Sequence, residues 1–140
     1  MFEQCNRIIM ANRTFSSPAD TSRKSFSDDE IQKVWNKGKK IDGEDESVYR
    51  QDYAGAWIKR DEYGNTDSTL GWEIDHRKPV AKGGSDDLTN LDPLQWNNNR
   101  TKSDDYPEWK TSMKAGESLT DRHFNVEKEQ GWKIKQYLKT

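Results

Sequence analysis

The sequence predicts an α+β fold built around one strand–loop–strand–helix unit, with a helix before it and an irregular extension after it. Three observations predict this fold. Residues 71–104 follow the order strand, loop, short strand, helix; a helix start signal precedes them at Ser27; and residues 105–140 give only weak signals. With 140 residues, we expect one domain over residues 25–140 and a flexible polar tail at 1–24.

The first helix has a clear beginning. Ser27 followed by Glu30 is a capping box, in which each side chain bonds the other residue's backbone N–H. Ile31, Val34 and Trp35 then form one apolar stripe, so the helix is expected to serve packing.

The central unit is bounded by turn residues and prolines. The strand of residues 71–80 (GWEIDHRKPV) stops where Pro79 forbids further pairing, and the following loop turns at its Gly-Gly pair. Residues 91–96 (LDPLQW) predict a short returning strand. The helix that begins in WNNNRTKSDD is limited by Pro107.

The flanking segments predict less regular structure. Residues 41–53 are acidic and loop-like, whereas residues 56–65 (AWIKRDEYGN) predict a strand that runs into a Gly-Asn turn. Towards the C-terminus we expect short strands near 110–113 and 124–126, and a final helix around 131–138.

Composition excludes several classes of protein. Hydrophobic residues make up 30% and charged residues 34%, so the core is small and loops are extensive. A formal charge of -2 excludes nucleic-acid binding by bulk attraction, so any nucleic-acid contact must come from local basic positions or the C-terminal tail. The single cysteine excludes an internal disulfide and a CxxC zinc site. Without a membrane-length apolar run or a secretory leader, a cytoplasmic location and no membrane partner are expected.

Four side chains of the central unit have the chemistry of phosphodiester hydrolysis. Asp75 and His76 end the first strand, Asn90 ends the loop and Asn99 lies on the helix. Histidine can take a proton from water near neutral pH. Mg²⁺ prefers oxygen ligands and keeps several waters, so Asp75 and the amide oxygen of Asn99 would suffice to hold it. Asn90 can hold the loop by bonding backbone groups.

This stretch resembles the HNH (ββα-metal) endonuclease family. The pattern comprises, in order, Asp75-His76, Pro79, Gly83-Gly84, Asn90-Leu91, Asn99 and Lys102. The resemblance implies that His76 is the general base, that Asp75 and Asn99 bind the metal, and that Asn90 has a structural role. It also implies that Lys102 or Arg100 contacts phosphate, and Lys82 in the loop is a further candidate for such a contact.

The sequence departs from the family pattern in two ways. Asn99 stands where many relatives have histidine, which gives an HNN variant suited to Mg²⁺, with Mn²⁺ as the alternative. Gln95 and Asn98 stand where many relatives have zinc-binding cysteines, so no structural zinc is expected. The site must then be braced by packing, for which the candidates are Trp57, Trp72, Trp96 and the helix of Phe26–Trp35.

The resulting expectation is a metal-dependent endonuclease that hydrolyses DNA and nicks one strand per active site. Glu73 is a candidate auxiliary group that could orient water or a second metal, but a solvated surface carboxylate is the favoured interpretation. His123 is expected to have a surface or packing role. Two other functions stay open: a toxin or effector nuclease neutralised by a partner protein, and a DNA-binding module without turnover. RNA as substrate and a homodimer also stay open.

Overall fold

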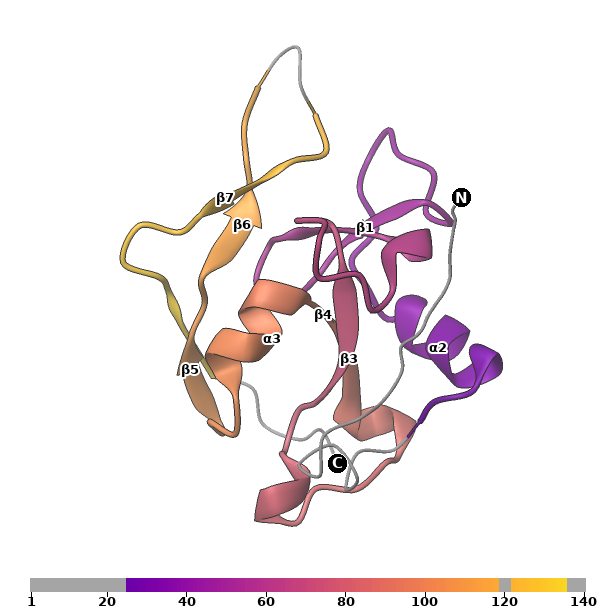
Figure 1. Cartoon of the computed structure of the whole chain (residues 1–140), viewed down its shortest axis with the longest axis vertical. Coiled ribbons are helices and arrows are strands. Elements are labelled where there is room, and N and C mark those ends of the chain that lie inside the picture. Colours follow the sequence, from indigo (N-terminus) through magenta and orange to yellow (C-terminus); the bar gives the residue numbers. More distant parts are fainter. Residues whose placement is uncertain (1–24, 119–121, 136–140) are drawn as a thin grey trace.

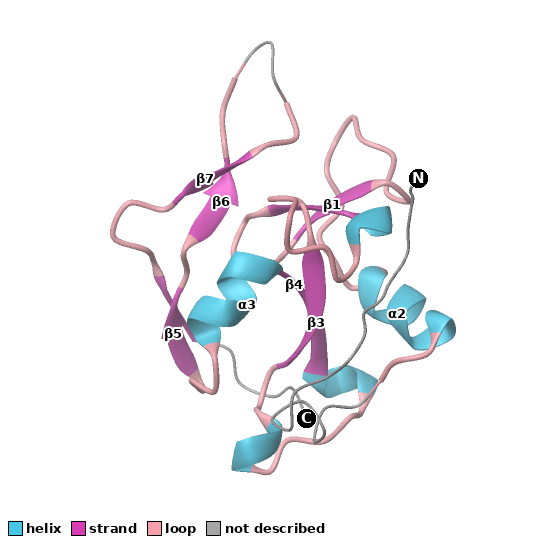
Figure 2. Ribbon diagram, viewed as in Figure 1, coloured by secondary structure: helices cyan, strands magenta, loops and turns pink. Residues whose placement is uncertain are grey.

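A computed structural model of the chain describes residues 25–118 and 122–135 (Figure 1). These residues form a small α+β fold with two α-helices and four two-stranded antiparallel sheets (Figure 2). The tail expected at residues 1–24 lies outside the described residues. No helix within the described ranges has the length and apolar character needed to cross a membrane.

A β-hairpin and the helix that follows it occupy the centre of the molecule. Strand β3 (Trp72–His76) pairs with β4 (Leu91–Gln95), and α3 (Trp96–Lys102) begins at the next residue and contacts both strands. The expected order strand, loop, strand, helix is therefore present. Strand β3 ends at His76, three residues before Pro79, so Asp75 and His76 stand at its end as predicted.

Helix α2 (Asp28–Trp35) covers the other side of the hairpin and packs on β4 (Figure 1). The capping box is confirmed, because the Glu30 N–H donates to Ser27 Oγ and the Ser27 N–H donates to Glu30 Oε1. The core beneath this helix consists of six buried side chains: Ile31, Val34, Trp35, Ile58, Trp72 and Leu91. Packing around Trp72 thus braces β3 from the side of α2.

The remaining strands form three short antiparallel pairs. Their bounds are β1 (Tyr49–Gln51) with β2 (Trp57–Lys59), β5 (Glu108–Lys110) with β8 (Lys133–Lys135), and β6 (Met113–Ala115) with β7 (Asn125–Glu127). Two predictions need correction here. The segment expected to be a loop at 41–53 contains β1, and the final helix expected at 131–138 is wrong over its described part, which contains β8. Residues 136–138 of that prediction lie outside the described residues.

A buried polar network braces the opposite side of the hairpin, and sequence reasoning did not find it. Asp52 is 1% exposed; its Oδ1 accepts from the N–H groups of Ala54 and Ala56, at 3.0 and 2.8 Å. Its Oδ2 accepts from the Gln95 N–H at 2.9 Å and from Asn98 Nδ2 at 3.1 Å. Burial raises the pKa of Asp52, and the four N–H donors oppose that shift. Asp52 therefore joins the β1–β2 turn to the junction of β4 and α3.

Asn98 extends this network to the C-terminal strands. Its Oδ1 accepts from the backbone N–H groups of Ser112 and Met113, each at 2.8 Å. Of the expected aromatic braces, Trp72 and the helix of Phe26–Trp35 belong to the core on one side of the hairpin, whereas Trp57 and Trp96 do not. Hydrogen bonds fix the other side.

Candidate active site

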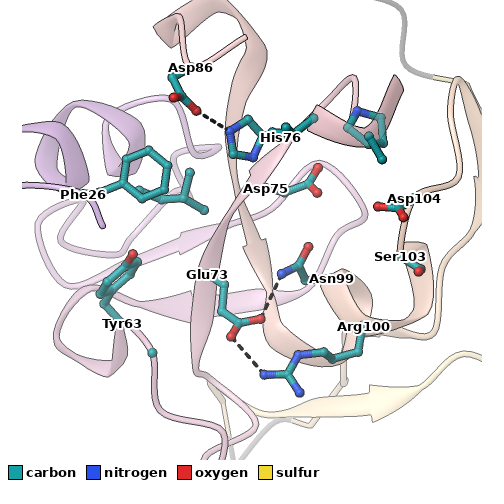
Figure 3. Close-up of a pocket in the computed structure, with 15 residues that line it drawn as sticks. Phe26, Tyr63, Glu73, Asp75, His76, Asp86, Asn99, Arg100, Ser103 and Asp104 are labelled. Atoms are coloured by element: carbon teal, nitrogen blue, oxygen red, sulfur yellow. Dashed lines mark hydrogen bonds and ion pairs between the residues drawn. The ribbon is translucent and has the colours of Figure 1, made fainter. Parts of the chain in front are cut away.

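A pocket of about 740 Å³ opens beside the end of β3 (Figure 3). Polar side chains from β3 and α3 line one part, and Phe26 and Tyr63 line another. The pocket brings together three of the four central residues predicted from sequence, namely Asp75, His76 and Asn99. Asn90 is buried outside it.

Asp75 is buried at the pocket wall, with 5% of its surface exposed. Its Oδ1 lies 3.3 Å from the Nζ of Lys102, whereas its buried Oδ2 has no hydrogen-bond partner. Burial raises the pKa of the Asp75 carboxyl to about 7, although the Lys102 ammonium opposes the shift. A buried carboxylate oxygen without a partner is costly, and a cation bound to it would relieve that cost.

His76 reaches the pocket from the last position of β3. Its Nε2 lies 2.7 Å from Oδ1 of Asp86, a residue of the following loop to which sequence reasoning assigned no role. The Phe26 ring lies near the imidazole, with 6.2 Å between ring centroids. The side chain is 19% exposed, so water can reach the ring.

Asn99 is oriented by Glu73. The Nδ2 of Asn99 donates to Glu73 Oε1 at 2.9 Å, and an ionised carboxylate can only accept, which fixes the orientation of the amide. The Oδ1 of Asn99 is consequently on the side of Asp75 (Figure 3). Glu73 also accepts from Arg100 at 3.1 Å, so this candidate auxiliary residue is not a solvated carboxylate but a partner of two residues of α3.

The neighbouring asparagines, Asn97 and Asn98, do not line the pocket. Asn98 belongs to the buried network of Asp52, and Asn97 Oδ1 accepts from Gln95 Nε2 at 2.9 Å. Only Asn99 of the three lines the pocket.

Asn90 holds the loop between β3 and β4. Its Oδ1 accepts from the Lys78 N–H at 2.8 Å, and its Nδ2 donates to the carbonyls of Lys78 and Ser85, at 3.0 and 2.7 Å. Gly84 must be glycine because a Cβ there would lie 1.7 Å from the Lys78 carbonyl oxygen. The contacts fit the structural role predicted for Asn90.

Replacing Asn90 by alanine is expected to lower the free energy of unfolding by about 2 kcal/mol or more, because the Lys78 N–H and two carbonyls lose the buried side chain that pairs with them. Urea denaturation measures this effect. Thr89→Ala is the matched control, since Thr89 is the exposed neighbour and should change stability by less than about 0.5 kcal/mol. Equal stabilities of the two variants would contradict the role given to Asn90.

The three basic residues predicted to contact phosphate differ in exposure. Lys102 is 0% exposed, and its Nζ bonds Asp75 and the His76 carbonyl oxygen, so its burial does not fit a surface phosphate contact. It instead supplies positive charge to Asp75. Arg100 has a side chain that is 55% exposed at the pocket, and Lys82 is exposed on the loop. These two can reach a phosphate.

Comparisons of this chain with protein-family models, with curated proteins and with solved structures find no match.

Proposed function

We propose that this chain is a metal-dependent endonuclease of the HNH type, in its HNN variant, which hydrolyses phosphodiester bonds of DNA. The observation that supports it best is that Asp75, His76 and Asn99 line one pocket, although a strand end and a helix supply them. A carboxylate, an imidazole and an amide oxygen together provide a base and an oxygen-rich cation site. Hydrolysis of a phosphodiester requires both.

The donor atoms suit a hard cation. Oδ2 of Asp75 is buried without a partner, and Glu73 turns Oδ1 of Asn99 towards Asp75. No group of three or more His, Cys, Asp or Glu side chains able to share an ion occurs in the described part of the chain. Mg²⁺ needs no such group, because it keeps several waters and takes one or two protein ligands beside the phosphate. Asp75 and Asn99 would hold it, with Mn²⁺ as the alternative.

The bound ion would neutralise charge on the phosphate and on the departing oxygen. Three side chains of the chain carry out the other roles. His76 takes the proton of the attacking water, and Lys102 keeps positive charge beside Asp75. Arg100 can exchange its ion pair with Glu73 for one with a phosphate oxygen at the pocket mouth. One pocket handles one phosphate, so each encounter should nick a single strand.

A plasmid-nicking assay on the full chain tests the metal dependence. Supercoiled DNA should become open-circular with Mg²⁺ or Mn²⁺, remain intact with EDTA, and be cut again when excess Mg²⁺ is restored. Nicking that persists in EDTA, or none with either ion, would refute the proposal.

A matched pair of asparagine variants tests the site itself. Asn99→Ala should lower the nicking rate at least about tenfold, because it removes a metal ligand. Asn97→Ala, on the same helix but outside the pocket, should cut at the wild-type rate. Equal nicking rates for both variants would show that Asn99 is not part of the site.

A further inference from the structure

The hydrogen bond between His76 and Asp86 restricts which nitrogen of the imidazole carries a proton. An ionised carboxylate accepts hydrogen bonds and donates none, so the 2.7 Å contact of Asp86 Oδ1 requires a proton on His76 Nε2. In the neutral ring, the lone pair is then on Nδ1. Asp86 lies on one side of the ring, and Asp75, Asn99 and Asp104 lie on other sides of it (Figure 3).

The loop that carries Asp86 is fixed at both of its ends. Asn90 Nδ2 donates to the carbonyl of Ser85, the residue before Asp86, and the Arg77 N–H donates to the Asn90 carbonyl at 2.7 Å. The Gly84 N–H donates to the Pro79 carbonyl at 2.9 Å, which closes the turn. Asp86 thus reaches His76 from a braced backbone, and the bonds of Asn90 act on the imidazole through it.

We propose that Asp86 is a positioning residue for the general base. Its carboxylate holds His76 with the proton on Nε2, so that the unprotonated Nδ1 is presented to the pocket to accept a proton from water. The catalytic consequence of this proposal, a well-placed general base, rests on the proposed function. The tautomer of His76 itself can be observed without any turnover. It also gives Asn90 a path to catalysis, through Ser85 and Asp86.

Because Asp86 is exposed, its positioning role can be tested separately from any contribution to stability. Its side chain is 47% exposed, and an exposed ion pair contributes little to stability. The Asp86→Ala variant should therefore fold as the wild type does. Asp87, the next residue, is also exposed, which makes Asp87→Ala a matched control.

The first test is the tautomer of His76, read by long-range ¹H–¹⁵N NMR of the metal-free full chain at pH 8. The wild type and Asp87→Ala should have His76 protonated on Nε2. Asp86→Ala should show a mixture of the two tautomers. Asp86→Asn, which keeps the shape but can donate as well as accept, should also lose the fixed state. An unchanged His76 spectrum in both Asp86 variants would overturn the proposal.

The second test is cleavage kinetics with Mg²⁺. Asp86→Ala should lower kcat by about 10- to 100-fold with KM unchanged, while Asp87→Ala keeps both constants. A raised KM with unchanged kcat would show a substrate-binding role and overturn the positioning role. If the wild type cuts no DNA, the nuclease proposal fails, and the NMR result alone decides whether Asp86 sets the tautomer.

Discussion

Replacing His76 by alanine is expected to lower the rate of DNA cleavage by about 10²- to 10⁴-fold, because the attacking water loses the group that takes its proton. Stability should change little. The side chain of His76 makes its hydrogen bond to the exposed Asp86 and does not belong to the hydrophobic core. The measurements are the plasmid-nicking rate with Mg²⁺ and the thermal midpoint of unfolding.

His123 provides the internal control, because it is the only other histidine. It stacks on Tyr49 with 4.1 Å between centroids, and its Nε2 lies 2.8 Å from Glu44 Oε1, away from the residues that line the pocket. His123→Ala should thus lower stability and leave cleavage unchanged, the reverse of His76→Ala. If His76→Ala cuts as fast as His123→Ala, His76 is not the base.

Replacing Asp52 by alanine is expected to lower the free energy of unfolding by about 3 kcal/mol or more. Four N–H groups lose their acceptor, and a buried donor without a partner costs about 1–3 kcal/mol. For a domain of this size, such a loss lowers the melting temperature by roughly 10 °C. Calorimetry or urea denaturation measures it.

Asp61→Ala is the matched control for Asp52, because the Asp61 side chain is 76% exposed. Its removal should change stability by less than about 0.5 kcal/mol. An Asp52 variant as stable as the Asp61 variant would mean that the buried network does not brace the hairpin.

Local sequence signals predicted the central elements well. The Ser27–Glu30 box, Pro79 and the Gly-Gly pair each act within a few residues, so their effect on backbone geometry can be read from the chain. The same holds for Asn90, whose three partners lie in the loop that it closes. These features were enough to predict that Asp75, His76 and Asn99 lie close together.

Contacts between distant residues could not be predicted in this way. Asp52 lies 43 residues from Gln95, and nothing in its acidic, loop-like surroundings distinguishes it from a solvated aspartate. The sequence predicts a helix where β8 lies, because only pairing with the distant β5 makes these residues a strand. The position of Lys102 in the motif predicts a phosphate ligand, yet packing buries its side chain against Asp75. Nothing in the sequence distinguishes Asp86, because aspartate is common in turn-rich loops for local reasons.

The position of a bound cation tests the central claim most directly. Crystals grown with Mn²⁺ and measured at the manganese absorption edge should contain an anomalous peak at about 2.1 Å from both Oδ2 of Asp75 and Oδ1 of Asn99, as oxygen ligands of small divalent cations require. The same crystals should show His76 unligated beside the ion. A peak bound elsewhere, or a pocket without manganese in crystals of protein that cuts DNA with Mn²⁺, would contradict the account.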